Sequence, residues 1–250
     1  MGSKSRIAKY IVPILQKEID DNNIKTYLEP FVGGGNIIDK IDCNVRIGSD
    51  LNQYLIELLK YVQHDGNLPN AITKEEYDKV RSAFNNRDTS DYEDWYVGAV
   101  GFLASYNGRW FDGGYAKSGY EKTKNDLRFR DYYRESKDNL LNQAPKLKNI
   151  SFICLPYQSW TVKGEFWCSK ALIYCDPPYA NTKQFLNSQK FDYDEFWQTM
   201  RIWSKTNTVY ISELQAPDDF ECVWEQEISR SIKATNKIRA VEKLFRYKGE

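Results

Sequence analysis

Residue types that build metal sites are scarce in this sequence of 250 residues. It has a single histidine, His64, and no CxxC pair; its five cysteines are Cys43, Cys154, Cys168, Cys175 and Cys222. Zinc sites draw mainly on Cys and His ligands, so we expect no metal site. An odd number of scattered thiols is also untypical of a disulfide-stapled secreted fold, and it favours a reducing cytoplasm.

Long apolar runs and a net charge are absent as well. The longest apolar run, at residues 97–104, falls far short of the roughly 20 residues that a membrane-spanning helix needs, and the N-terminus has no apolar signal-peptide core. We therefore expect no association with a membrane. The 35 basic and 35 acidic residues balance, which argues against indiscriminate coating of nucleic acid but permits a local basic groove.

Helix and strand patterns alternate in the first and last parts of the chain. Residues 5–19 place apolar side chains on one face of a helix of about four turns. A strand pattern at 24–30 runs into a glycine turn and a helix, and a second at 44–50 runs into an acidic turn and an amphipathic helix. Further strand patterns lie at 149–155, 170–175 and 207–213. This alternation predicts an α/β fold with a doubly wound parallel sheet.

The middle of the chain has a different character. From about residue 67 to residue 145 it is polar and irregular, with tyrosines, lysines and arginines interleaved. Neither an internal repeat nor a low-complexity tract is visible. We expect residues 1–62 and 148–250 to form the sheet and its helices, and residues 63–147 to form a mostly helical insertion.

A glycine-rich segment, EPFVGGG at residues 29–35, follows the first strand and is expected to open a helix. Glycines let the backbone approach a ligand closely, and a helix start offers free N–H groups. Asp50, 15 positions after Gly35, ends the next strand, where a carboxylate can accept both hydroxyls of a ribose. Each feature has a plain structural alternative, a tight turn for the glycines and a helix N-cap for Asp50. Together they favour a nucleoside cofactor without a large phosphate group, and S-adenosylmethionine fits that description.

A strand pattern at 171–175 ends in Asp176-Pro177-Pro178-Tyr179. Proline cannot continue a strand ladder, so one interpretation is a strand stop followed by a surface turn. The other is a catalytic loop, because prolines fix an extended path and hold neighbouring hydrogen-bond acceptors in place. Since parallel strands present their carboxyl ends at one edge of a sheet, we expect Asp176 and the glycine turn to face one crevice.

The ordered set of EPFVGGG, Asp50, a long insertion and DPPY resembles the Dam-like DNA adenine-N6 methyltransferases, in the alpha-group order of motifs. GSK at 2–4 is similar to the family's N-terminal Gly-Gly-Lys, and NTVYISE and AVEKLFRY resemble the compact members from phages and mobile elements. The resemblance implies a Rossmann-like S-adenosylmethionine-dependent methyltransferase sheet with an inserted target-recognition domain at 63–147.

The activity implied by this resemblance is methyl transfer from S-adenosylmethionine to the N6 amino group of a flipped-out adenine in double-stranded DNA, in the cytoplasm of a bacterial host cell. Two alternatives stay open. One is an RNA or protein amino-methyltransferase that shares the DPPY motif, and the other is a catalytically silent DNA-binding relative.

The resemblance also implies roles for individual residues. The Asp176 side chain would accept one N–H of the adenine amino group and the Pro177 carbonyl the other, with Pro178 locking the loop and Tyr179 stacking on the base. The residues implied for cofactor binding are Lys4, Glu29, Pro30, Phe31, Gly33, Gly35, Asp50 and Asp176, with Phe152 or Tyr157 lining the adenosine pocket.

The segment SYNGRW at 105–110 is similar to the family's target-recognition segment. This similarity implies Tyr106 as a wedge in the base stack, Asn107 as the partner of the orphaned base and Arg109 as a phosphate or base contact. A turn around a core tyrosine is the alternative. From 115 to 148, nine Lys/Arg against five Asp/Glu would suit either a DNA-facing strip or a solvated helix face. We expect double-stranded DNA as the partner and a monomeric enzyme.

Overall fold

The computed structural model describes residues 4–64, 66–122, 127–178, 191–233 and 236–249. Its α-helices are α1 (Ala8–Asp21), α2 (Gln53–His64), α3 (Lys74–Asn85), α4 (Asp94–Leu103), α5 (Tyr132–Leu147) and α6 (Tyr193–Ser204). Short 3-10 helices are η1 (Lys4–Arg6), η2 (Ile38–Lys40), η3 (Tyr106–Gly108), η4 (Trp110–Gly113) and η5 (Tyr157–Trp160). The strands are β1 (Thr26–Glu29), β2 (Val45–Asp50), β3 (Gly119–Lys122), β4 (Leu127–Arg130), β5 (Ile150–Cys154), β6 (Thr161–Val162), β7 (Glu165–Phe166), β8 (Ala171–Cys175), β9 (Thr208–Glu213), β10 (Phe220–Lys233) and β11 (Asn236–Tyr247).

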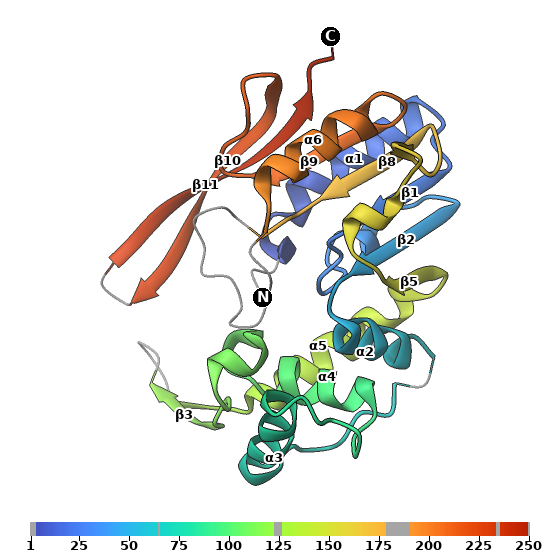
Figure 1. The fold of residues 1–250 in the computed structure, drawn as a ribbon. Helices are drawn as coiled ribbons and strands as arrows, with labels where there is room; N and C mark the ends of the chain where they lie inside the picture. Colours follow the sequence, from blue (N-terminus) through green and yellow to red (C-terminus); the bar gives the residue numbers. More distant parts are fainter. Residues whose placement is uncertain (1–3, 65, 123–126, 179–190, 234–235, 250) are drawn as a thin grey trace.

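A seven-stranded sheet in the order β10-β11-β9-β8-β1-β2-β5 forms the centre of the molecule (Figure 1). The strands β5, β2, β1, β8 and β9 run parallel to one another, and β11 runs antiparallel to both β9 and β10. In chain order the five parallel strands read 3-2-1-4-5, which is the order of a doubly wound α/β sheet. The predicted fold class is therefore confirmed.

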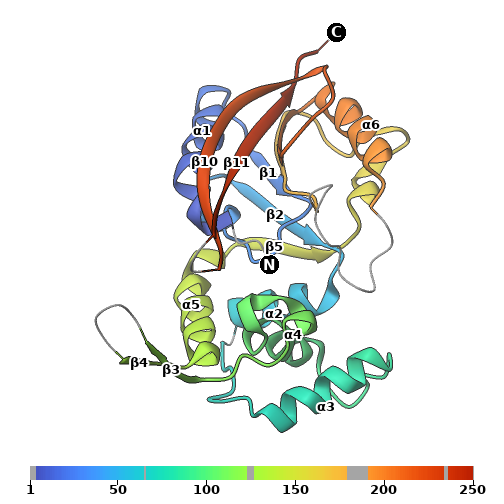
Figure 2. The same cartoon turned by 90° about the vertical axis from the view of Figure 1, so that its left-hand side faces the viewer.

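Both faces of the sheet are buried, which is why its central strands are continuous apolar runs. In β8, Leu172 and Tyr174 belong to the core on one face, while Ile173 and Cys175 belong to the core on the other. Helix α1 covers the first face and α6 the second (Figure 2). The predicted N-terminal helix and the helix after Asp50 are confirmed as α1 and α2.

The prediction of a helix directly after the glycine turn is wrong. Only η2, a single 3-10 turn at Ile38–Lys40, separates the glycines from β2. After the glycine turn, residues 36–44 return along the sheet to β2, and the structure has only this 3-10 turn among them. Ile37, Ile38 and Ile41 instead pack as an irregular layer into the core.

The insertion between β2 and β5 contains α3, α4, α5 and the β3–β4 hairpin, and it shares the core of the α1 face. The long apolar run of the sequence is α4, whose residues from Val97 to Leu103 are all buried. A Cβ at Gly98 would lie 2.2 Å from the Tyr54 carbonyl oxygen, so this glycine allows α4 to pack closely on α2. No helix in the described part of the chain is both long and apolar enough to span a membrane.

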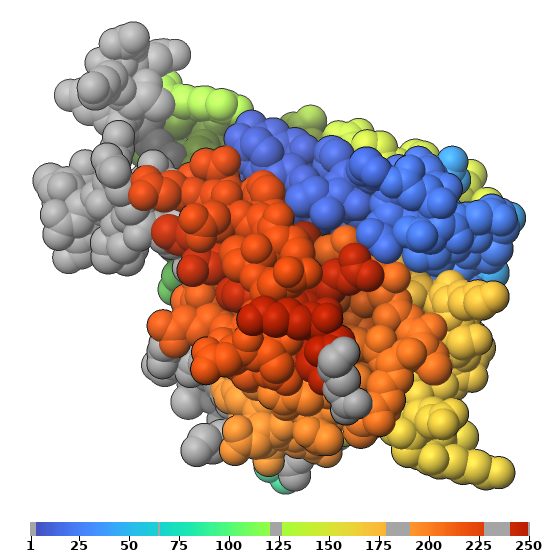
Figure 3. All heavy atoms as spheres, turned by 90° about the horizontal axis from the view of Figure 1, so that it is seen from above, coloured from blue at the N-terminus to red at the C-terminus, as the bar shows by residue number. Residues whose placement is uncertain are grey.

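The sequence patterns did not predict the long C-terminal hairpin β10–β11. Its strands pair from Phe220–Tyr247 to Lys233–Asn236, but β11 pairs with β9 only over Lys243–Arg246. The rest of the hairpin therefore extends beyond the sheet, towards the side where the insertion lies (Figures 1 and 2). At its base the hairpin lies alongside α1, where the rings of Tyr10 and Trp224 are 5.9 Å apart (Figure 3).

Candidate active site

The candidate site lies where the chain changes direction across the sheet. β1 continues to β2 on one side, whereas its other neighbour β8 continues to β9 on the opposite side. Ligands of doubly wound sheets bind beyond the carboxyl ends of the strands at this switch point. Leu28 is paired with Ile173, so Glu29 at the end of β1 and Asp176 just after β8 reach the same edge. The two motifs singled out in the sequence therefore meet there.

The glycine turn is fixed by the acidic end of β2. The Gly33 N–H donates to Oδ2 of Asp50 (3.1 Å), and the Asn52 N–H donates to Oδ1 (3.0 Å). Gly33 and Gly35 have φ angles of +50° and +67°, a conformation that favours glycine. The N-cap alternative for Asp50 is wrong, because Asn52 Oδ1 accepts the hydrogen bond from Leu55 N at the start of α2 (3.1 Å). Asp50 instead links the glycine turn to the strand end.

Two further residues hold this turn, and the sequence reasoning missed both. A Cβ at Gly48 would lie 2.7 Å from Cγ2 of Val32, so β2 needs glycine where the turn folds back on it. A glycine inside a strand was the available signal. Gln143 of α5 donates from Nε2 to the carbonyl oxygens of Gly34 (3.1 Å) and Gly35 (3.0 Å). Nothing local in the sequence announces this contact from the insertion.

Glu29 is a buried carboxyl group beneath the turn, only 3% exposed. Burial raises the pKa of Glu29 to about 8, and the nearby Asp176 contributes to the rise. The Tyr27 hydroxyl donates to Oε1 of Glu29 (2.6 Å) and acts in the opposite direction on this pKa. The Lys40 ammonium also lowers this pKa, but it does not offset the effect of burial.

This raised pKa predicts a pH dependence of stability. Between about pH 4.5 and pH 8 the folded protein binds a proton on Glu29 that the unfolded chain releases, so the contribution of Glu29 to stability is lost as the pH rises. As the pH rises through this window, the free energy of unfolding of Glu29→Gln should increase by roughly 3–5 kcal/mol relative to that of the unsubstituted protein. Urea unfolding of both proteins at several pH values, without cofactor, measures this difference. Glu57→Gln, on the exposed face of α2, is the control, and a constant difference across the window would contradict the prediction.

Asp176 is held in an ion-pair chain. Lys4 Nζ lies 3.1 Å from Asp176 Oδ1 and 3.0 Å from Oε2 of Glu242, a buried residue of β11. Burial raises the pKa of the Asp176 carboxyl, the Lys4 ammonium lowers it, and Glu242 raises it. The structure thus brings the predicted Lys4 and Asp176 together, and adds Glu242, which the sequence reasoning did not select.

The residues after Asp176 belong to the loop that is predicted to hold the adenine amino group, which we call the clamp. Pro177 is buried and Pro178 is exposed, and the Pro178 carbonyl accepts a hydrogen bond from the Tyr193 hydroxyl (2.6 Å). The expected stacking residue, Tyr179, lies outside the described residues, so its role stays a prediction.

The remaining predicted cofactor residues lie around the turn. Pro30 is buried, and the Phe31 ring packs 5.3 Å from the ring of Tyr157. Phe152 and Tyr157 are buried in the cores on opposite faces of the sheet, 5% and 6% exposed.

An apolar side chain that was not selected from the sequence stands at the same edge. Leu51, which directly follows Asp50, is 70% exposed. Its position directly after the strand-end carboxylate Asp50 was the signal that could have identified it as a candidate ligand contact.

The predicted DNA-contacting residues lie together on an exposed turn of the insertion. Tyr106 is 46% exposed, so the alternative of a core tyrosine is wrong. Asn107 has a φ of +54°, and both Asn107 and Arg109 are exposed. The turn is anchored by Trp110, which is buried against α4, where a Cβ at Gly101 would lie 2.5 Å from the Trp110 ring.

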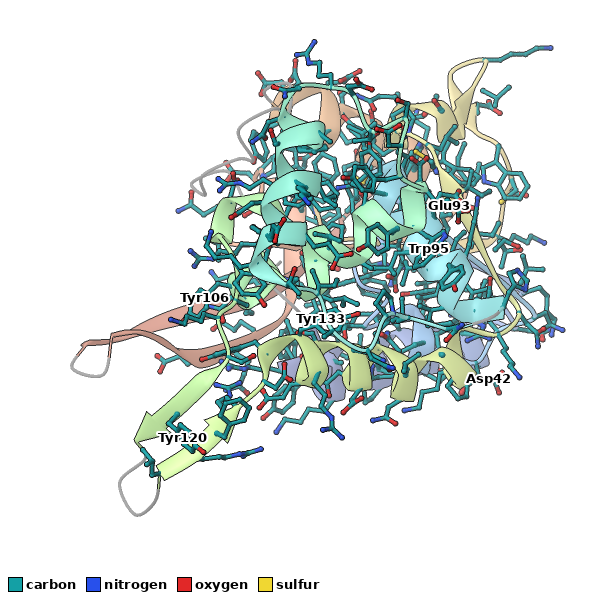
Figure 4. All side chains as sticks on the ribbon, turned by 90° about the horizontal axis from the view of Figure 1, so that it is seen from below. Asp42, Glu93, Trp95, Tyr106, Tyr120 and Tyr133 are labelled. Atoms are coloured by element: carbon teal, nitrogen blue, oxygen red, sulfur yellow. The ribbon has the colours of Figure 1, made fainter. Side chains whose placement is uncertain are left out.

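Tyr106 borders a shallow hollow of about 330 Å³ on the insertion, whose lining includes Tyr115, Lys117, Tyr120 and Tyr132. Tyr106 on η3 and Tyr120 on the β3–β4 hairpin lie on the same side of the insertion (Figure 4). The Arg130 guanidinium lies 4.4 Å from the centre of the Tyr132 ring. Aromatic rings interleaved with cations are the composition of a nucleic-acid contact surface.

The glycine turn bound to Asp50 and the carboxylate of Asp176 lie at the edge where doubly wound sheets bind their ligands. A family model, D12 class N6 adenine-specific DNA methyltransferase, matches residues 1–216. The chain belongs to this family, which confirms the predicted resemblance.

Curated relatives agree with this assignment. The type II methyltransferase M.MjaIII of Methanocaldococcus jannaschii is 30% identical over 220 residues, which are 78% of this chain and 73% of that protein. A DNA adenine methylase of Salmonella typhi is 28% identical over 190 residues, 70% of this chain and 63% of that protein. A DNA adenine methylase of Vibrio cholerae is 27% identical over 168 residues, 61% of this chain and 56% of that protein. The aligned part thus spans less than two thirds of both adenine methylases.

Among solved structures, the rRNA methyltransferase aviRa from Streptomyces viridochromogenes gives a TM-score of 0.42 at 9% identity, over 98% of this chain and 85% of that chain. A likeness at this level carries no argument about function.

Proposed function

We propose that this chain methylates the N6 amino group of an adenine flipped out of double-stranded DNA, with Asp176 and Pro177 as the acceptors that hold the amino group. The observation that carries the proposal is the meeting of Asp176 with the glycine turn and Glu29 at the switch point of the sheet. A methyl donor and a flipped base can approach each other only where both half-sites share one edge.

The donor set fits S-adenosylmethionine, which supplies an electrophilic methyl group on a cationic sulfur. Asp50, held by two backbone N–H groups, retains lone pairs for the two ribose hydroxyls. Leu51 would offer apolar surface to the purine ring, and Phe152 or Tyr157 would line that pocket. Lys4, which pairs with Asp176 and Glu242, would also bind the methionine carboxylate, and Glu29, with Pro30 and Phe31, would bind the positive groups of the cofactor.

The residue types of the clamp follow from the chemistry of adenine. The amino lone pair is delocalised into the ring, which makes the nitrogen a poor nucleophile. Asp176 accepts one N–H and the Pro177 carbonyl the other, which holds the nitrogen closer to tetrahedral geometry and aims its lone pair. The methylated amine is strongly acidic, so its proton leaves through Asp176 without a base tuned near pH 7.

The insertion, residues 63–147, is proposed as the target-recognition part between the two catalytic segments, 1–62 and 148–250. Extrusion of a base costs a few kcal/mol, and the gap must be filled. Tyr106, exposed on its anchored turn, enters the stack, Asn107 meets the orphaned base, and Arg109 contacts a phosphate or base edge. One chain supplies all these groups, which supports a monomer, and we propose that it acts in the cytoplasm.

The experiment for this function measures transfer of a labelled methyl group to duplex DNA, structured RNA and protein. The expected result is incorporation into DNA alone, recovered as N6-methyladenine after digestion to nucleosides. Incorporation into RNA or protein would favour the alternative amino-methyltransferase, and incorporation into no substrate by a protein that binds DNA would favour the silent relative.

The wedge role of Tyr106 predicts a substrate-dependent defect. Tyr106→Ala should lower single-turnover methylation of fully paired DNA about tenfold, the loss of one stacking contact. The defect should shrink when the target adenine faces a mismatch, because the mismatch has already lowered the cost of extrusion. A 2-aminopurine at the target position reports extrusion in parallel. Tyr10→Ala, on α1, is the control, and equal defects on paired and mismatched DNA would contradict the role.

A further inference from the structure

The active site contains a carboxylate of β11, Glu242, to which the sequence reasoning gave no role. We propose that Glu242 of β11 is a positioning residue, which draws Lys4 partly away from Asp176 and so keeps the Asp176 carboxylate available to the adenine amino group. This inference rests on the proposed function of Asp176.

The geometry places one ammonium group between two carboxylates. Lys4 Nζ lies at nearly equal distances from Asp176 Oδ1 (3.1 Å) and Glu242 Oε2 (3.0 Å). The side chains of Lys4, Asp176 and Glu242 are only 10%, 21% and 5% exposed. Charges this well shielded from water interact strongly with one another, and removal of one of them leaves an uncompensated charge. Glu242 therefore acts on the site through Lys4.

Sharing of Lys4 meets two opposing requirements on Asp176. Asp176 must be ionised, which burial opposes and Lys4 favours. It must also accept an N–H from adenine, for which a Lys4 bound to Asp176 alone would compete. A second carboxylate that holds the ammonium at a midpoint satisfies both requirements.

The position of β11 in the sheet provides this second carboxylate. The pairing of β11 with β9 begins at Lys243, which lies opposite Glu213 at the end of β9. Glu242 precedes Lys243, so it stands at the carboxyl edge of the parallel strands, where Asp176 also lies. The single reversed strand of the sheet thus brings an acidic side chain to the catalytic edge.

The titratable groups around Asp176 come from four elements. Among the described residues they are Lys4 from η1, Glu242 from β11, Glu29 from β1, and Tyr174 and Cys175 from β8 itself. Lys4 is the cation among them. Substitution of Lys4 or of Glu242 should consequently shift the ionisation of Asp176 in opposite directions.

The test compares the pH dependence of single-turnover DNA methylation, at saturating cofactor, for Glu242→Gln and Lys4→Met. In Glu242→Gln, Asp176 loses a negative neighbour and gains a larger share of Lys4. The acid limb of the pH–rate profile of this variant, where the rate rises as Asp176 ionises, should move about one unit to lower pH. A single charge within about 4–6 Å has an effect of this size on a pKa. The plateau rate should fall about tenfold, as for other groups that orient a functional side chain indirectly. In Lys4→Met the acid limb should move to higher pH.

Glu225→Gln provides the matched control, because Glu225 lies on the same hairpin and forms an exposed ion pair with Lys243 (3.7 Å). Its acid limb should not move. Glu242→Asp keeps the negative charge but moves it away from Lys4, because the side chain is shorter. It should shift the acid limb in the same direction as Glu242→Gln, and it replaces that variant in the test if Glu242→Gln does not fold.

Two results would overturn the inference if the unsubstituted enzyme methylates DNA. One is an acid limb that does not move in either Glu242 variant. The other is a shift of the acid limb in the same direction for the Glu242 variants and Lys4→Met. An unsubstituted enzyme that methylates no DNA would instead refute the proposed function.

Discussion

Asp176→Ala is expected to lose methyl transfer by about a thousandfold or more while it still folds and binds both substrates. The loss is this large because the carboxylate interaction strengthens as the amino nitrogen becomes tetrahedral, so it stabilises the transition state more than the ground state. Single-turnover methylation of a duplex at saturating cofactor measures the chemical step. Calorimetry with S-adenosylmethionine and a DNA-binding titration measure the steps before it.

The matched control is Asp218→Ala, an exposed aspartate outside the catalytic edge. It should keep the rate of the unsubstituted enzyme. Mismatched DNA should not rescue Asp176→Ala, because its defect follows base extrusion, whereas it should partly rescue Tyr106→Ala. A rate above one tenth of that of the unsubstituted enzyme for Asp176→Ala would remove Asp176 from the clamp.

The second large effect is expected for Asp50→Ala, in the binding of S-adenosylmethionine. The substitution removes the acceptor for the ribose hydroxyls and also releases the Gly33 and Asn52 N–H groups. Loss of charge-assisted hydrogen bonds of this kind costs about 1.5–3 kcal/mol, which is roughly a tenfold to hundredfold weaker affinity.

Calorimetric affinities of the unsubstituted protein, Asp50→Ala and the control Glu57→Ala measure this effect, since Glu57 is a half-buried carboxylate on α2 paired with Lys60. Unchanged affinity for Asp50→Ala would give Asp50 a structural role only, as the anchor of the glycine turn.

The parts of the site that were predictable are those with a local signal. Apolar runs interrupted by glycine or proline identified β1, β2 and β8, and the rule that ligands bind at strand ends placed Gly33, Asp50 and Asp176 on one edge. Gln143 and Glu242 carry no such signal, because each contributes through a contact with a residue more than 100 positions away. Such contacts depend on how distant elements pack.

Two errors have physical causes of the same kind. The helix expected after Gly35 does not form, and Ile37, Ile38 and Ile41 instead pack into the core around a single 3-10 turn. The β10–β11 hairpin escaped prediction, and β11 pairs with β9 only over Lys243–Arg246, so the parallel sheet constrains only a short part of it. The periodicity of apolar residues predicts a helix or strand only where one face of that element is buried.

Lys4 and Glu242 are separated by 238 positions in the chain and yet form one ion-pair chain with Asp176. During synthesis, a nascent chain that already carries the glycine turn and DPPY still lacks β11, and the edge of β9 has no partner. The charge balance around Asp176 is completed only when β11 has left the ribosome and docked. Methylating activity should therefore arise late in synthesis, and fragments that stop before β11 should accumulate as inactive chains with an exposed, aggregation-prone strand.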